Sequence, residues 1–287
     1  MSVIFFDTDC ELWYTQAEEL GCPVIKMPYT IDREEKFYDL GKETDFKDFY
    51  TRVRSGSMPV TSALNPTQYV EIFEPYFAKG EEILYISFSS EMSGTFNHLE
   101  VALKELNEKY KGVKFTRFDT KSISFGGGYQ VYFAVKYFQE GHTIDETVEF
   151  LKDFTHHVSV NFMVDDLMHL FRGGRLSRMS AFLGSALGIK PILQIPESGK
   201  LEVVEKVKGE KKAINYFLAR LEENGLELDK YPIVVLDADN SELAERLKSS
   251  ITAKYPESTI WHYPVGPVIG AHAGPGTVAV IFHSKNR

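Results

Sequence analysis

Short apolar runs that alternate with segments of helical period are the feature that most restricts the fold of this 287-residue chain. Four runs in the first half have the length and apolar content of buried strands: Ser2–Phe6, Cys22–Lys26, Ile83–Phe88 and Lys114–Asp119. Two segments carry their apolar residues on one helical face, namely Phe96, Leu99, Leu103, Leu106 and Tyr110, and then, after the cap Thr143, Ile144, Val148, Leu151 and Phe154. Strands that alternate with helices favour a parallel sheet with helices on both faces.

The second half predicts a mixed sheet. Ile189–Ile195 has the pattern of a strand, and a turn at residues 197–199 leads into the alternating run Lys200–Val207, so these two strands should pair antiparallel. Two further strands and two helices are expected at Ile233–Asp237, Thr277–Phe282, 214–221 and 243–251. A helix and a sheet that pack against each other need one apolar face each, and this pattern supplies it.

Length and pattern together predict an α/β protein of two domains, since a domain takes about 150 residues. We expect a three-layer parallel sheet with hydroxyl-rich ligand loops in residues 1–158. Residues 159–287 should form a mixed sheet with helices mainly on one side, together with an Arg-Gly-Gly-Arg loop and a glycine-rich loop around a histidine.

Composition narrows the class of protein. The chain has 32 Lys+Arg against 41 Asp+Glu, a net charge of −9 with no basic stripe, so no nucleic-acid partner is expected. No apolar run approaches the roughly 18 residues of a membrane span, and the N-terminus lacks the basic region of a secretory signal. Cys10 and Cys22 are too few for a disulfide framework, which favours a cytoplasmic location.

Two segments carry hydroxyls where a helix is about to begin. Ser93-Gly94-Thr95 offers free backbone N–H groups, a hydroxyl and a glycine that allows close approach, which together suit an anion; its alternative role is a simple helix cap. Thr61-Ser62 adds a second hydroxyl pair, or else only shapes the turn before the next helix.

Two further segments carry nitrogen-bearing side chains beside glycine. His272 lies in a glycine-rich stretch, so the backbone rather than a helix face is expected to set its surroundings. Arg172 and Arg175 flank two glycines in a motif that ends at Ser177, which suits a carboxylate, a phosphate or an acidic partner. The alternative for the arginines is the capped end of a helix.

The motifs of several enzyme classes are missing from the sequence. No serine lies in a GxSxG elbow and no GxxxxGK[ST] phosphate loop occurs. His156 and His157 are adjacent, so they cannot chelate one metal as an HxxxH pair would. We therefore predict a binding protein with no catalytic residue, no metal and no cofactor.

In this order, these segments resemble the DegV family of bacterial fatty-acid-binding proteins. The matching segments span nearly the whole chain: Asp7-Thr8-Asp9, Thr61-Ser62, Ser90–Thr95, Asp119–Ser122, Arg172–Ser177, Gly188–Leu193 and Gly266–Gly276. Each match alone is weak, and seven in register are specific.

The resemblance implies a two-domain fold that holds one long-chain fatty acid between the domains. It implies that Thr61, Ser62, Ser93 and Gly94 bind the carboxylate, with His272 nearby. Family members of this type present the acid to a separate ATP-dependent fatty acid kinase, whose acyl phosphate product feeds phospholipid synthesis. Arg172 or Arg175 would then face the kinase or the head group, and transient membrane contact stays open.

Two departures from the family pattern bear on the ligand. Residues 63–65 read Ala-Leu-Asn where the family usually has a Gln-Pro-Ser type of turn, and Ala271 and Ala273 stand where bulkier residues are common. Two other functions stay open: a hydrolase that uses Ser93 and His272 but lacks an elbow and a third member, and a sensor of small anions with the same hydroxyls and no acyl slot.

Overall fold

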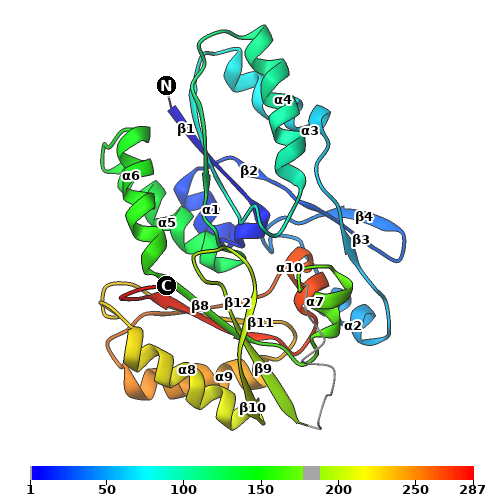
Figure 1. Ribbon diagram of the computed structural model, residues 1–287, viewed down its shortest axis with the longest axis vertical. Helices are drawn as coiled ribbons and strands as arrows, with labels where there is room; N and C mark the ends of the chain where they lie inside the picture. Colours follow the sequence, from blue (N-terminus) through cyan, green and yellow to red (C-terminus); the bar gives the residue numbers. More distant parts are fainter. Residues whose placement is uncertain (1, 177–187) are drawn as a thin grey trace. The chain divides into compact units, whose positions relative to one another are not determined.

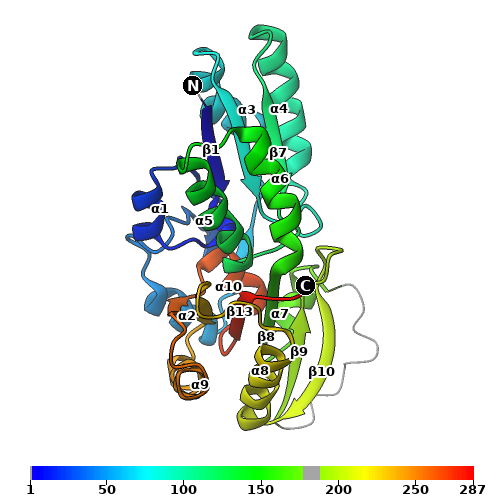
Figure 2. The same ribbon diagram turned by 90° about the vertical axis from the view of Figure 1, so that its left-hand side faces the viewer.

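The computed structural model describes residues 2–176 and 188–287 and divides the chain into two compact units (Figures 1 and 2). The first unit runs up to Thr44 and continues over Thr61–Thr155, and the second contains Asp45–Val60 and His156–Arg287. The sequence-based division after residue 158 therefore differs at two places: the break falls after residue 155, and residues 45–60 belong to the second unit.

Helix α2 (Phe46–Arg54) accounts for the second difference. Its Tyr50 hydroxyl donates to the carbonyl of Val265 at 2.7 Å, and Arg54 pairs with Asp239 at 2.5 Å. Both partners lie about 200 positions further along the chain, at separations of 215 and 185 residues, so local sequence pattern contains no sign of them.

A four-stranded parallel sheet in the order β2-β1-β6-β7 forms the centre of the first unit. Its strands are β1 (Ser2–Asp7), β2 (Val24–Ile25), β6 (Glu82–Ser87) and β7 (Phe115–Asp119). The predicted strands are confirmed, with β2 shorter than expected. The helices are α1 (Tyr14–Leu20), α3 (Pro66–Phe77), α4 (Thr95–Lys109), α5 (Phe125–Gln139), α6 (Ile144–Phe154) and the 3₁₀ turn η1 (Thr8–Cys10).

Helices cover both faces of this sheet, with α3 and α4 on one side and α1, α5 and α6 on the other (Figure 1). On the first side, Phe73 packs edge-on against Phe5 and Phe115, with ring centroids 5.0 Å apart in each pair. On the second side, a Cβ at Gly128 would lie 2.4 Å from the carbonyl oxygen of Cys10. A Cβ at Gly127 would lie 2.9 Å from Cys10 Sγ, so both Gly127 and Gly128 are needed for close packing on η1.

Three short strands form a second sheet, in the order β4-β3-β5, that the sequence did not predict. They are β3 (Pro28–Ile31), β4 (Glu34–Phe37) and β5 (Val60–Thr61). β4 reads Glu-Glu-Lys-Phe and is largely exposed, so it lacks the alternation on which strand prediction relies.

The second unit is built on a six-stranded sheet in the order β10-β9-β8-β13-β11-β12, in which only the β11–β12 pair is parallel among the pairs described. The strands are β8 (Val158–Met163), β9 (Ile189–Gln194), β10 (Glu202–Lys208), β11 (Ile233–Asp237), β12 (Ile260–Pro264) and β13 (Val278–His283). The predicted antiparallel pairing of β9 with β10 is confirmed, whereas β12 was not predicted.

Two long helices, α8 (Glu210–Asn224) and α9 (Ser241–Lys254), pack against one face of this sheet (Figure 1). Their apolar residues share a buried core with the sheet, including Phe217, Leu247, Val235 and Val280. Two short helices, α7 (Met168–Arg172) and α10 (Pro267–Ala273), contact each other. The predicted α/β fold class, a parallel sheet followed by a mixed one, is confirmed. Within the described residues, no helix combines the length and apolarity of a membrane span.

Candidate functional site

Ser93 and Gly94 lie in the loop that leads from β6 into α4, at the carboxyl edge of the parallel sheet. Gly94 caps the helix with a φ of −84° and no side-chain bond, and Ser93 Oγ accepts from the backbone N–H of Thr95 at 3.2 Å. Ser93 thus supports the first turn through one lone pair and keeps its hydroxyl proton for another acceptor. A Cβ at Gly94 would meet Asn97 Nδ2, its nearest described neighbour, at 4.0 Å, so packing here does not require a glycine.

Thr61 and Ser62 lie at the end of β5, where Thr61 is half-buried and Ser62 exposed. The turn into α3 is made by Asn65, whose side chain accepts from the backbone N–H of Gln68 at 2.9 Å while the Gln68 side chain accepts from that of Asn65 at 2.9 Å. This capping box explains the Asn-Pro pair that precedes the helix. The hydroxyls of Thr61 and Ser62 lie outside it.

Two hydrogen bonds hold these loops next to each other. His98 Nδ1 on α4 bonds the carbonyl oxygen of Leu64 at 2.7 Å, and the Tyr69 hydroxyl on α3 bonds Thr95 Oγ1 at 2.8 Å. Helices α3 and α4 lie side by side and both begin at the carboxyl edge of the sheet (Figure 1). The structure therefore brings the Thr61-Ser62 and Ser93-Gly94 segments to the N-termini of two neighbouring helices, where anions are favoured.

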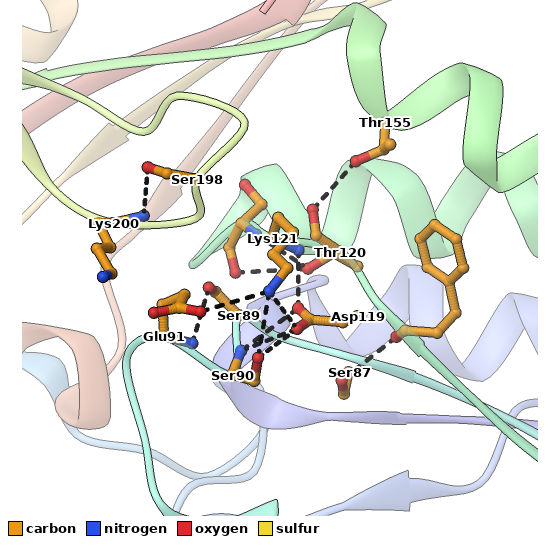
Figure 3. Close-up of polar contacts among 12 residues, drawn as sticks. Ser87, Ser89, Ser90, Glu91, Asp119, Thr120, Lys121, Thr155, Ser198 and Lys200 are labelled. Atoms are coloured by element: carbon orange, nitrogen blue, oxygen red, sulfur yellow. Dashed lines mark hydrogen bonds and ion pairs between the residues drawn. The ribbon is translucent and has the colours of Figure 1, made fainter.

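A carboxylate at the end of β7 fixes the beginning of the Ser93 loop (Figure 3). Asp119 accepts from the hydroxyl of Ser90, from the backbone N–H of Ser90 at 3.3 Å and from that of Lys121 at 2.9 Å. Lys121 Nζ pairs with Asp119 at 3.1 Å and with Glu91 at 3.7 Å. We call Ser90, Glu91, Asp119 and Lys121 the Asp119 cluster.

The Asp119 carboxyl is ionised at neutral pH. Burial raises the pKa of the Asp119 carboxyl, but the hydrogen bonds from Ser90 and Lys121 together lower it by more. The pKa of Asp119 therefore lies below its ordinary value. Sequence reasoning recorded this segment only as a family motif and missed its role, because Ser90 and Asp119 are 29 positions apart.

A second carboxylate, Asp7, is fully buried at the end of β1. It accepts from the Tyr85 hydroxyl at 2.8 Å, from the backbone N–H of Phe88 at 3.1 Å and from that of Asp9 at 3.1 Å. Burial raises its pKa to about 6, against the opposing effect of these hydrogen bonds. Since Phe88 begins the loop to Ser93, Asp7 holds this loop two residues before Ser90, where Asp119 holds it.

In the second unit, the Arg-Gly-Gly-Arg motif is the end of helix α7. Gly173 is the C-cap, with φ −71° and ψ −7°, Arg172 is exposed, and half-buried Arg175 donates from Nη1 to the carbonyl of Gly173. The capped-helix alternative for this motif is therefore confirmed. Ser177, at the end of the predicted motif, lies outside the described residues.

His272 lies on a helix, which corrects the prediction of a loop. Gly266 precedes helix α10, Pro267 occupies its first position and Gly274, at φ +77°, ends it. Proline at the first position and glycine after the last are the ordinary boundaries of a helix. The glycine-rich composition predicted a loop because two of these glycines lie just outside a single short helix. Burial, with a smaller contribution from the charge of Arg175, lowers the pKa of His272 to about 4, so the imidazole is neutral at pH 7.

A third histidine, His262 on β12, was not singled out from the sequence. Its Nε2 contacts Asp237 at 2.9 Å and its Nδ1 contacts Glu245 at 3.2 Å. The hydrogen bond with Asp237 raises the pKa of His262. Asp237, the last residue of β11, therefore has a partner on the neighbouring strand β12.

Over residues 2–176 and 188–287 no group of three His, Cys, Asp or Glu side chains is arranged to hold a metal ion.

The expected site residues thus fall into two groups. Thr61, Ser62, Ser93 and Gly94 belong to the first unit, and His272, Arg172 and Arg175 belong to the second. Within the second unit, α7 and α10 pack together, so the histidine and the two arginines share one local structure.

Comparison with known proteins gives matches along the whole chain. The model of the family described as uncharacterised proteins of the DegV family matches residues 2–285. A DegV domain-containing protein of Clostridium perfringens is 37% identical over 280 residues, which cover 98% of this chain and 96% of the relative.

Solved structures give the same result. A structure described as fatty acid binding of a DegV family protein from Thermus thermophilus superposes with a TM-score of 0.87 at 25% identity, and covers 98% of this chain and 99% of that one. The structure of DegV from Bacillus subtilis, described as a fatty acid binding protein, has a TM-score of 0.83 at 27% identity and covers 99% of each chain.

Proposed function

Because the chain belongs to the DegV family, we propose that it is a cytoplasmic, non-catalytic carrier that binds a long-chain fatty acid and presents it to a separate ATP-dependent fatty acid kinase. The kinase would transfer the γ-phosphoryl group of ATP to a carboxylate oxygen, giving ADP and an acyl phosphate for phospholipid synthesis. The fatty-acid-binding descriptions of the Thermus and Bacillus relatives support the ligand class.

The carboxylate of the ligand is assigned to Thr61, Ser62, Ser93 and Gly94. A carboxylate removed from water must accept hydrogen bonds, or it takes up a proton. The juxtaposed starts of α3 and α4 supply hydroxyls and first-turn N–H groups, and this juxtaposition is the observation that carries the proposal. The family resemblance adds His272, whose neutral imidazole can donate one hydrogen bond and accept another.

The acyl chain would provide most of the affinity. A tail of about 16 carbons at ~0.8 kcal/mol per buried CH₂ contributes ~13 kcal/mol before the costs of association. A surplus of ~8 kcal/mol, about two thirds of that amount, corresponds to micromolar binding, so the ligand should stay bound through purification.

The direct test extracts the purified protein with organic solvent and identifies the extract by mass spectrometry. We expect long-chain fatty acid near one equivalent per chain. Binding of a fatty acid to delipidated protein should weaken by roughly 1.5–3 kcal/mol in Ser93→Ala, which loses a donor to a charged group. Ser250→Ala is the matched control, since Ser250 is a half-buried serine on α9 whose hydroxyl donates to the carbonyl oxygen of Arg246 on the same helix.

The outcomes separate the functions that were left open. Turnover of ester substrates by a protein that contains no lipid would support the hydrolase, and binding of short carboxylates without fatty acids would support the anion sensor. Unchanged fatty-acid affinity in a Ser93→Ala variant that folds normally by circular dichroism would remove Ser93 from the head-group site.

A further inference from the structure

Helices α7 and α10 are packed through two reciprocal contacts between a histidine and a glycine. A Cβ built on Gly173, at the end of α7, would lie 2.1 Å from Nδ1 and 2.9 Å from Cε1 of His272 on α10. A Cβ on Gly274, at the end of α10, would lie 2.5 Å from Cδ2 of His169 on α7. Each imidazole therefore occupies the space above a glycine of the other helix.

The two glycines are needed for different reasons. Gly274 has a φ of +77°, which disfavours other residues even without a contact. Gly173 has a φ of −71° and a ψ of −7°, which any residue adopts. The backbone at Gly173 does not call for glycine, so the requirement comes from the imidazole above it.

The backbone that carries His272 is held from its other side as well. Gly270 on the same helix lies against Tyr50 of α2, where a Cβ would be 2.5 Å from the hydroxyl oxygen, and that hydroxyl bonds Val265 just before the helix. Thr277 Oγ1 donates to the carbonyl oxygen of Ala273 at 3.0 Å. With α10 fixed at these points, a side chain at position 173 would displace the His272 ring rather than the helix.

We propose that Gly173 is a positioning residue for His272: the absence of a side chain at 173 determines where the His272 imidazole lies. The effect on ligand binding rests on the proposed function, in which His272 contributes to the head-group site. The effect on packing does not. The glycines of the Arg-Gly-Gly-Arg motif then have separate roles, because Gly174 at φ +73° has no described atom within 4 Å of an added Cβ.

A double-mutant cycle in the full chain tests the contact. Gly173→Ala should lower the midpoint of thermal unfolding by about 3–10 °C, the ordinary cost of overpacking. In a His272→Ala background the same change should cost about 1 °C or less, because the ring is gone. If Gly173→Ala alone does not fold, the double variant should fold as His272→Ala does. Gly174→Ala is the control, since its strain should cost the same in both backgrounds.

Two further measurements follow the imidazole itself. The NMR signal that His272→Ala removes should titrate near pH 4 in the unchanged protein and move toward 6.5 in Gly173→Ala as the ring leaves its buried position. Fatty-acid affinity should fall about tenfold in His272→Ala and by a similar factor in Gly173→Ala.

The inference and the proposed function can fail separately. Equal stability costs of Gly173→Ala in both backgrounds, or an unchanged His272 titration, would overturn the positioning role. A second outcome would retain the positioning role and remove His272 from the ligand site. In it, the stability cost of Gly173→Ala depends on His272 and the pKa of His272 shifts in Gly173→Ala, but fatty-acid affinity is unchanged in both single variants.

Discussion

Removal of the Asp119 carboxylate should loosen the Ser93 loop and weaken ligand binding, although Asp119 itself is not assigned to the ligand. Asp119→Ala leaves two donor groups of Ser90 and two of Lys121 without their acceptor. Hydrogen bonds to a charged group are worth roughly 1.5–3 kcal/mol each, but water replaces part of them at a side chain that is 16% exposed. We expect a loss of unfolding free energy of about 2–4 kcal/mol.

The binding effect follows from the order that the loop loses. If about three residues before Ser93 must be fixed again when the ligand binds, at ~1 kcal/mol of backbone entropy each, affinity falls by up to ~3 kcal/mol. We expect a fatty-acid Kd raised roughly 10- to 100-fold. Asp119→Asn keeps one acceptor oxygen, so its fatty-acid Kd should lie between that of Asp119→Ala and that of the unchanged protein.

Isothermal titration of delipidated protein with a fatty acid, together with chemical unfolding, measures both quantities. Asp145→Ala is the matched control, because Asp145 pairs with Lys114 at 2.6 Å in the same unit but is 75% exposed, and exposed pairs contribute little. A large loss of stability in Asp119→Ala with an unchanged Kd for the folded molecules would refute the reasoning, since the loop would then not depend on this carboxylate for its binding geometry.

Two other predictions concern Asp7 and Arg172. The pKa of Asp7 is raised from 3.8 to about 6, so its contribution to stability is fully present below pH 3.8 and is lost as pH rises through 6, by roughly 3 kcal/mol. The free energy of unfolding, measured from pH 4 to 7, should show this fall. In Asp7→Asn, which should be less stable, the free energy of unfolding should vary less over the same pH range. Arg172 is exposed at the end of α7 and is expected to contact the kinase. Arg172→Glu should therefore slow acyl phosphate formation with a purified fatty acid kinase, while the fatty-acid Kd stays within about twofold. Equal losses of kinase rate and fatty-acid affinity would place Arg172 in the ligand site, and no change in either would place the kinase-docking surface elsewhere.

The elements predicted correctly are those whose burial is set by their own residues. β1, β6 and β11 are buried on both faces and read as continuous apolar runs, and α4 and α6 show one apolar face with a recognisable start. The missed elements lack such a pattern. β4 is exposed and polar, and β12 mixes aromatic, histidine and proline side chains in a half-buried edge strand.

The candidate site divides in the same way. The hydroxyls of Thr61, Ser62 and Ser93 were found because small polar residues before a helix form a local pattern. The carboxylates that organise the loop, Asp7 and Asp119, were not recognised, because their donors lie 78–81 and 29 positions away. A usable signal existed, since both are the last residue of a strand in one parallel sheet and the carboxyl ends of such strands meet at one edge.

Glycines beside polar residues illustrate why a motif alone does not identify a ligand site. Gly94 and Gly173 look alike in the sequence, each next to a side chain with binding chemistry, and both have negative φ. The protein itself requires Gly173, because the His272 ring fills the space that a Cβ would take. It does not require Gly94, where a Cβ would have 4.0 Å of clearance and where Ser, Asn or Asp would cap the helix at least as well as glycine. A glycine that folding does not demand is better explained by what approaches from outside. The comparison of these two glycines therefore favours Gly94 as a position against which the ligand lies. Gly173, the first glycine of the Arg-Gly-Gly-Arg motif, instead supports His272 from inside the protein.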